Sequence, residues 1–144
     1  MEINISEEEQ RKYFLDKWKE KDTQFICEVP VFCRSIDLVK YNKKKNTVSA
    51  VEFKTKNWKR AVEQVMSTAI SFDYVEICVR KPKTLKAQET IKEYCQAIGV
   101  GVYFFDTSVL DFEHILKPEK VEKIWNVQKA QVIDFILKED AYAK

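Results

Sequence analysis

The chain has 144 residues, which is enough for one compact domain with a sizeable buried core. Hydrophobic residues make up 45% and charged residues 33%, a balance that excludes a disordered or fibrous chain. No apolar run approaches the roughly 20 residues that a membrane span requires, and the acidic first ten residues lack a signal-peptide core. We therefore expect a single domain over residues 1–144, cytoplasmic and without a membrane partner.

The four cysteines and the single histidine limit the chemistry that we expect. The cysteines are scattered without a Cys-x-x-Cys pair, whereas a structural zinc site requires clustered Cys and His. Any Ser-His or Cys-His catalysis would need His114 as its base, and we expect His114 to be a polar residue of an edge strand instead. The composition therefore disfavours zinc binding and nucleophilic catalysis of these kinds.

The first half of the chain predicts one helix followed by three strands. Ser6 and Glu9 have the spacing of a capping box, so a helix is expected over residues 7–21. Strands are expected over 23–31, 34–41 and 47–56, the last two joined by a lysine-rich turn at 42–46. Such short connections predict an antiparallel meander.

The second half predicts alternating strands and helices. Helices are expected from Asn57 to residue 72, over 84–98 with Gly99 as the left-handed cap, and over 118–140, with strands at 73–79 and 100–105 and an extra edge strand at 109–116. The apolar stripes of the helices place three tryptophans in the core: Trp18, Trp58 and Trp125. The order αβββαβ, with extra C-terminal β and α elements, predicts an α/β mixed sheet with helices on both faces.

Two charged residues share one face of the strand at 47–56. Side chains alternate along a strand, so Glu52 and Lys54 project from the same face about 7 Å apart, while Phe53 points into the layer behind. Taken alone, a Glu-x-Lys pair is most often a surface ion pair. The preceding strand, however, carries Asp37 among apolar neighbours.

The hairpin brings Asp37 near Glu52. With a turn centre near Lys44, Asp37 faces Val51, and a shift of one residue would place Asp37 and Glu52 on one face. Two close carboxylates repel each other unless a cation intervenes. Mg²⁺ prefers oxygen ligands and needs only one or two carboxylates, and an adjacent ammonium group such as that of Lys54 can stabilise charge developing on a phosphate.

These residues resemble the PD-(D/E)XK nuclease superfamily, whose fold is restriction-endonuclease-like. The resemblance rests on Ile36-Asp37-Leu38-Val39, a lysine-rich turn, Val51-Glu52-Phe53-Lys54, and a helix with Ala61 and Gln64, and it covers residues 6–105. It implies that Asp37, Glu52 and the carbonyl of Phe53 hold Mg²⁺, for which Mn²⁺ can substitute. It also implies that Lys54 is the catalytic lysine and that Gln64 lies beside the site.

The resemblance departs from the family pattern in two places. Ile36 stands where the motif has proline. Some family members also use a glutamate of the first helix, for which Glu7, Glu8 and Glu9 are candidates, although an acidic first turn is also favoured by the helix dipole alone. Glu28 on the first strand is a further candidate.

Cations are concentrated around these strands. Between residues 40 and 60, Glu52 is the single acidic residue among eight cations: Lys40, Lys43, Lys44, Lys45, Lys54, Lys56, Lys59 and Arg60. This stretch is either a solvated face or a surface that faces a polyanion. If it binds nucleic acid, the residues after the strand, Lys56, Lys59 and Arg60, are expected to contact phosphates.

The sequence thus predicts a metal-dependent nuclease that hydrolyses phosphodiester bonds in DNA. Three alternatives stay open: a catalytically silent nucleic-acid-binding module of the same fold, a subunit of a larger restriction, transposition or repair assembly, and a structural protein in which Asp37, Glu52 and Lys54 form an ion-pair cluster. DNA and RNA are not distinguished by these residues, and neither are a monomer, a homodimer and a larger complex.

Overall fold

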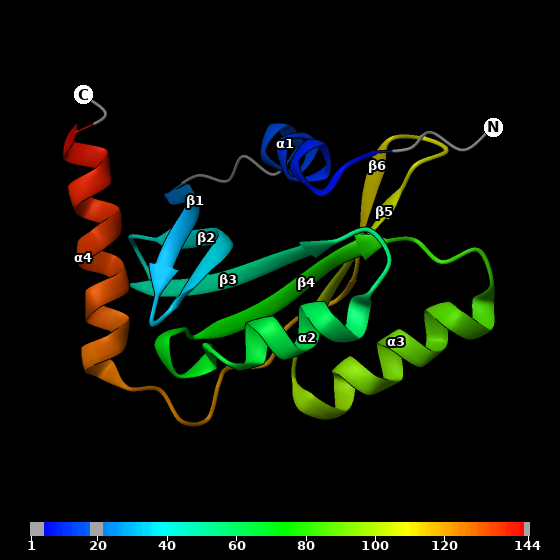
Figure 1. Cartoon of the computed structure of the whole chain (residues 1–144). Helices are drawn as coiled ribbons and strands as arrows, with labels where there is room; N and C mark the ends of the chain where they lie inside the picture. The colour runs from blue at the N-terminus through cyan, green and yellow to red at the C-terminus, as the bar shows by residue number, and fades with distance from the viewer. Residues whose placement is uncertain (1–4, 18–21, 143–144) are drawn as a thin grey trace.

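A computed structural model describes residues 5–17 and 22–142 of the chain, with side chains described as far as residue 139. One six-stranded mixed sheet and four α-helices make up this part (Figure 1). The elements are α1 (Glu7–Lys17), β1 (Thr23–Val31), β2 (Arg34–Asn42), β3 (Thr47–Lys54), α2 (Trp58–Met66), a 3-10 turn η1 (Ala69–Ser71), β4 (Tyr74–Arg80), α3 (Leu85–Ile98), β5 (Gly101–Asp106), β6 (Asp111–Leu116) and α4 (Asn126–Tyr142). The predicted α/β mixed-sheet class and element order are confirmed.

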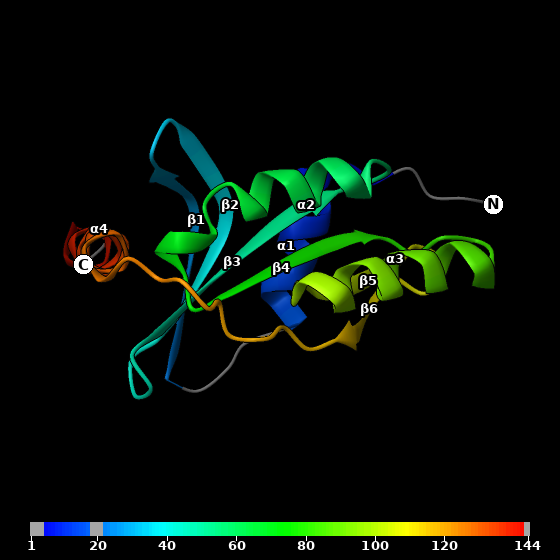
Figure 2. The ribbon, with the colours of Figure 1, turned by 90° about the horizontal axis from the view of Figure 1, so that it is seen from below.

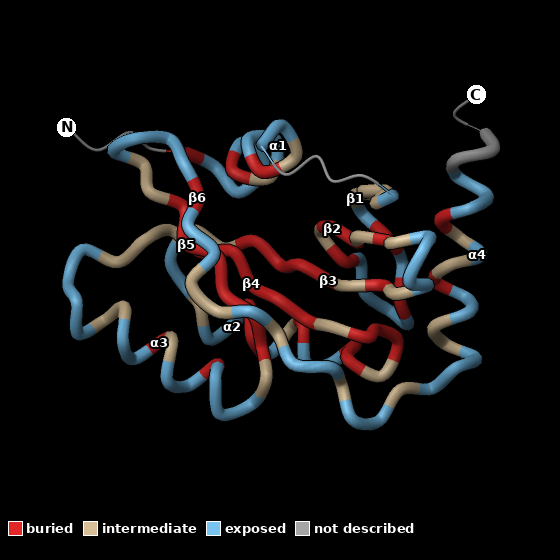
Figure 3. Tube along the Cα trace, turned by 180° about the vertical axis from the view of Figure 1, so that it is seen from behind, coloured by how far each residue is buried: buried red, intermediate tan, exposed pale blue. Residues whose placement is uncertain are grey.

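The strands lie in the sheet in the order in which they occur in the chain, from β1 to β6. The pairs β1–β2, β2–β3 and β5–β6 are antiparallel, whereas β3–β4 and β4–β5 are parallel. The parallel centre is buried on both faces, as Figure 3 shows for β3, β4 and β5, and it is apolar except for Glu52 and Glu76. Residues 111–116 form the expected edge strand.

Helices cover both faces of the sheet. Helix α1 lies on one face and helices α2 and α3 on the other, while α4 stands beside β1 (Figures 1 and 2). On the α1 side, Phe14 packs edge-to-face against Phe53, Tyr103 and Phe112, with ring centroids 5.4, 5.0 and 5.3 Å away. None of the described helices is long and apolar enough to cross a membrane.

Local sequence signals set the helix ends. The hydroxyl of Ser6 accepts the backbone N–H of Glu9 at 3.1 Å, and the side chain of Asn57 accepts that of Arg60 at 3.2 Å. Gly99 ends α3 with φ of 76°, in the left-handed region that glycine adopts without a Cβ clash. All three predicted caps are confirmed.

The ends of two helices differ from the prediction. Helix α4 begins at Asn126 rather than Pro118, because residues 117–125 pass the start of β4 and bond there: the N–H of Val121 donates to Asp73 O and that of Trp125 to Ile70 O, both at 2.8 Å. Trp125 is 61% exposed, so its predicted core position is wrong.

Helix α2 ends at Met66, and the 3-10 turn η1 occupies part of its predicted last turn. Trp58 is partly buried against the core, as expected. Trp18 and the predicted end of the first helix, residues 18–21, lie outside the described residues.

Candidate functional site

The register of the β2–β3 hairpin decides whether the predicted carboxylates meet. Leu38, rather than Asp37, faces Val51 in the structure, so the predicted pairing of Asp37 with Val51 is wrong by one residue. The turn closes with Asn46 at φ of 54°, a left-handed conformation that asparagine tolerates better than most residues. Because of this register, Asp37 lies level with Glu52.

Two hydrogen bonds, each from a backbone N–H to a carboxylate, join the strands that carry Asp37 and Glu52. The carboxylate of Asp37 accepts the N–H of Phe53 at 2.8 Å, through Oδ2. In return, Oε1 of Glu52 accepts the N–H of Asp37 at 3.4 Å. Each acidic side chain is therefore held against the other's strand, and Glu52 is only 4% exposed.

The two carboxyl groups affect each other's ionisation because they lie in contact. The pKa of Glu52 is raised to about 8, by burial first and then by the charge of Asp37 and a hydrogen bond between the two side chains, while Lys54 opposes this increase in part. At neutral pH the pair therefore retains a proton. A bound cation would neutralise the same charge.

Lys54 lies at the end of β3, beside this pair. Its Nζ lies 4.0 Å from Oε2 of Glu7 in the first turn of α1, and its side chain is about one quarter exposed. At this distance the ion pair with Glu7 is loose, so the ammonium group remains available to another anion. The structure thus brings together Asp37, Glu52 and Lys54, as the sequence predicted.

A small cavity of about 220 Å³ lies between α1 and the strands, lined by Glu7, Glu8, Arg11, Glu28, Asp37 and Phe53. Glu9 does not line it and instead hydrogen-bonds to Ser6. Glu28 is held by an ion pair with Arg11 and by the hydroxyl of Ser35, and these bonds lower its pKa. Glu7 and Glu8 are therefore better placed than Glu9 or Glu28 to supplement Asp37.

The donor set fits a magnesium ion only with help from backbone and water oxygens. No three Asp, Glu, His or Cys side chains converge as a metal-binding group in the part of the chain that the structure describes. Mg²⁺ can be held by one or two carboxylates with several waters, so Asp37, Glu52 and the Phe53 carbonyl fit this ion. They do not fit zinc, which takes nitrogen and sulfur ligands in closed sites.

Gln64 is on α2, which packs against β3 and β4. Among the described residues, no hydrogen bond or ion pair joins it to Asp37, Glu52 or Lys54. Its Oε1 is nevertheless buried without a hydrogen-bond partner. A buried unpaired amide oxygen is costly, and a bound water would satisfy it. Gln64 does not line the cavity at Asp37, so its predicted place beside the site stays a prediction.

The three predicted phosphate-binding residues are exposed where β3 leads into α2. Nζ of Lys59 lies 5.7 Å from the ring centroid of Trp58, and Nη1 of Arg60 lies 3.3 Å from a carboxylate oxygen of Glu63. Lys56 lines a hollow of about 410 Å³ that further cations border: Arg80, Lys81 and Lys83. A basic surface thus adjoins Lys54.

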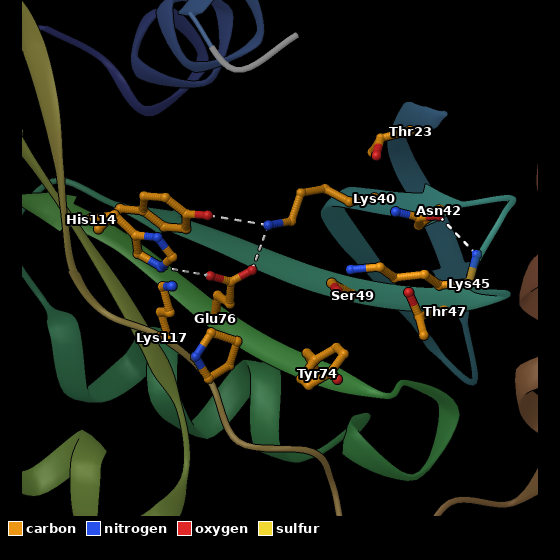
Figure 4. Close-up of a pocket in the computed structure, with 12 residues that line it drawn as sticks. Thr23, Lys40, Asn42, Lys45, Thr47, Ser49, Tyr74, Glu76, His114 and Lys117 are labelled. Atoms are coloured by element: carbon orange, nitrogen blue, oxygen red, sulfur yellow. Dashed lines mark hydrogen bonds and ion pairs between the residues drawn. The ribbon is translucent and has the colours of Figure 1, made fainter. Parts of the chain in front are cut away.

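A second polar cluster was not predicted. Glu76 on β4 is buried, and its carboxylate lies 2.6 Å from Nζ of Lys40 and 3.3 Å from Nε2 of His114 (Figure 4). The ring of His114 stacks on Tyr103, with centroids 4.0 Å apart. His114 lies on an edge strand, as expected, but it also pairs with a buried charge.

Although burial opposes ionisation of Glu76, Lys40 and His114 lower its pKa below the ordinary value. Gly101 leaves the space that this carboxylate occupies, because a Cβ there would lie 2.9 Å from Cγ of Glu76. The available sequence signal was Glu76 itself, the one acidic residue within an apolar strand, since a buried charge requires a partner.

Comparisons with known proteins establish the fold but no family. No protein-family model matches the sequence, and no curated protein matches it. A solved structure of a protein of unknown function from Silicibacter pomeroyi is similar over 85% of this chain and 77% of that one, with a TM-score of 0.60 and 16% sequence identity. The chain is thus similar to that protein in fold, at an identity too low to carry more than the fold.

Proposed function

We propose that this protein is a metal-dependent nuclease that hydrolyses phosphodiester bonds in DNA. The observation that carries the proposal is the convergence of Asp37 and Glu52 at one level of two adjacent strands, with Lys54 beside them. Two carboxyl groups in contact, one of them buried, are costly in a purely structural role. Their position is understandable if they serve to hold a cation.

The residues have distinct roles in this proposal. Asp37, Glu52 and the Phe53 carbonyl would hold Mg²⁺ or Mn²⁺, which would stabilise negative charge on the phosphate and make an attacking water more acidic. Lys54 stabilises the charge that develops on the phosphate oxygens as the bond breaks. Gln64 and Glu7 orient water at the edge of the site.

A nucleic-acid substrate, here DNA, is proposed because cations are exposed next to the site. Lys56, Lys59 and Arg60 are exposed beside Lys54 and would contact successive phosphates. Phosphate contacts position a strand without reading its sequence, so we expect little sequence preference from these residues.

The test is nicking of supercoiled plasmid in Mg²⁺ or Mn²⁺, compared with EDTA. Wild-type protein should nick in either metal and not in EDTA, and Asp37→Ala protein purified in the same way should be inactive while remaining folded. Equal nicking by wild type and Asp37→Ala would overturn the proposal, because a contaminating nuclease would then explain the activity.

A second candidate is a DNA-binding module of this fold that does not cleave, alone or within a larger assembly. It is favoured by the lack of a third converging acidic side chain among the described residues. Its signature is salt-dependent DNA binding by wild-type protein without metal-dependent nicking. Measuring binding and nicking on the same preparation separates the two candidates.

A further inference from the structure

A hollow of about 370 Å³ lies on the face of the sheet around Glu76 (Figure 4). It shares no lining residue with the cavity at Asp37. Val51 pairs with Glu76 across β3 and β4, so Glu76 lies on the face of Val51 while Glu52 lies on the opposite one. The hollow is therefore a separate site, within the size range of small-molecule pockets.

The floor of the hollow is fixed by buried charges. Lys40 donates to Glu76 at 2.6 Å and to the hydroxyl of Tyr103 at 3.2 Å, which uses two of its three N–H groups. His114 holds the other carboxylate oxygen of Glu76. Because Glu76 is already paired on both sides, it positions Lys40 rather than repelling an incoming anion.

Two further ammonium groups enter the hollow from opposite ends. Lys45 comes from the β2–β3 turn and extends along the sheet towards Ser49, and Lys117 comes from the chain that follows β6 (Figure 4). Within the described residues, neither side-chain ammonium group has a carboxylate within ion-pair distance. Three cations thus face one space whose single carboxylate is already paired, an arrangement that favours an anion with dispersed charge such as phosphate.

The remaining walls offer hydrogen bonds to a polar, uncharged part of a ligand. Oγ1 of Thr23 is buried at the hollow without a hydrogen-bond partner. The hydroxyl groups of Thr47 and Ser49 also line it. Such acceptors suit a ligand that carries hydroxyl donors in addition to its anionic group.

We propose that this hollow binds a phosphorylated sugar, with the phosphate between Lys45 and Lys117 and the sugar hydroxyl groups along Thr23, Thr47 and Ser49. The volume exceeds what a bare phosphate fills, and the wall is polar where the sugar would lie. Binding here does not depend on the proposed nuclease site, because the two sites share no residue.

The test uses ribose 5-phosphate as the probe, with ribose and inorganic phosphate as matched controls. Amide chemical shifts of the ¹⁵N-labelled protein report where each compound binds and with what affinity. Ribose 5-phosphate should shift Lys45, Ser49 and Lys117, bind several-fold more tightly than inorganic phosphate, and bind far more tightly than ribose.

Exposed lysines allow substitution without disturbing the core. Lys45→Ala and Lys117→Ala should each weaken binding of ribose 5-phosphate about five- to tenfold, as expected for loss of one charge-assisted hydrogen bond. Lys92→Ala, on α3 across the sheet, should leave the affinity unchanged. Asp37→Ala should also bind normally, which separates this proposal from the nuclease proposal.

Three results would overturn the proposal. The first is that ribose 5-phosphate shifts no residue of the hollow. The second is that the Lys45→Ala and Lys117→Ala proteins bind it as wild type does. The third is that a DNA oligonucleotide shifts these residues while ribose 5-phosphate does not, which would make the hollow part of a nucleic-acid surface.

Discussion

Two buried glutamates on neighbouring strands, Glu52 and Glu76, behave in opposite ways. They occupy almost the same level of the sheet, since across β3 and β4 Glu52 pairs with Ile77 and Glu76 pairs with Val51. Both are buried, at 4% and 1% exposed. Nevertheless, the pKa of Glu52 is raised to about 8, whereas that of Glu76 is lowered.

The difference comes from their neighbours rather than from burial. Glu76 touches two basic side chains, Lys40 and His114, so its negative charge is neutralised within the fold. Glu52 faces a second carboxylate, Asp37, and the nearest cation compensates only in part. A buried acid that the fold itself satisfies is structural, and one that the fold leaves unsatisfied marks a place for an external cation.

The largest expected effect concerns Lys54, beside the Asp37–Glu52 pair. Lys54→Ala should lower single-turnover cleavage of plasmid DNA by about 10²–10³, because one charge that stabilises the transition state is lost. DNA binding, measured by fluorescence anisotropy, should change little. Lys92→Ala serves as the control. Equal losses in rate and affinity would make Lys54 a plain phosphate contact instead.

Replacing each glutamate by glutamine should change the free energy of unfolding in different directions at the two sites. Glu76→Gln leaves the ammonium group of Lys40 buried without its carboxylate and should destabilise the protein by about 3–5 kcal/mol. Glu52→Gln removes a repulsion and should be neutral or stabilising at pH 8 without metal. Urea unfolding measures both changes, and a destabilisation of similar size in the two variants would contradict the comparison.

The pH dependence of stability should sharpen the same contrast. At pH values between the ordinary Glu pKa of 4.5 and the raised pKa of about 8, the folded protein keeps a proton on Glu52 that the unfolded protein releases. The free energy of unfolding should therefore fall as pH rises through this window, by up to ~1.4 kcal/mol per pH unit from this group.

Glu52→Gln should flatten that slope, and so should saturating Mg²⁺, since a bound cation displaces the proton. Thermal unfolding from pH 5 to pH 8.5 provides the measurement. An unchanged slope in the Glu52→Gln protein would assign the pH dependence to another group.

The smallest expected effect concerns the exposed cations beside the site. Replacing Lys56, Lys59 and Arg60 together by alanine should lower the slope of log affinity against log salt by roughly 2–3 units, because each phosphate contact releases counterions. Replacing Lys43 and Lys44 in the turn by alanine, which removes two charges, provides the comparison. If the salt slope is the same before and after the triple change, these three residues are solvent-exposed charges that do not contact phosphates.

The sequence by itself determined the element order, the helix caps and the candidate residues of the carboxylate site. These features are local: Ser6, Asn57 and Gly99 act on their own helix ends, and alternation along one strand places Glu52 with Lys54. Asp37 and Glu52 could be chosen as candidate residues from the sequence because each stands out within its own strand. Their nuclease role remains a proposal.

Only the tertiary structure decided the register and the long-range pairs. A turn centre misplaced by half a residue changes which side chains face each other. In the structure Leu38 pairs with Val51, and this register places Asp37 level with Glu52. Glu76 contacts Lys40 and His114 because β2, β4 and β6 lie in one sheet, each separated from the next by one strand. The sequence pattern of a single strand carries no information about such a contact. Residues 117–125 are not helical because their backbone N–H groups donate to distant carbonyls, those of Gly99, Asp73 and Ile70, instead of to their own helix.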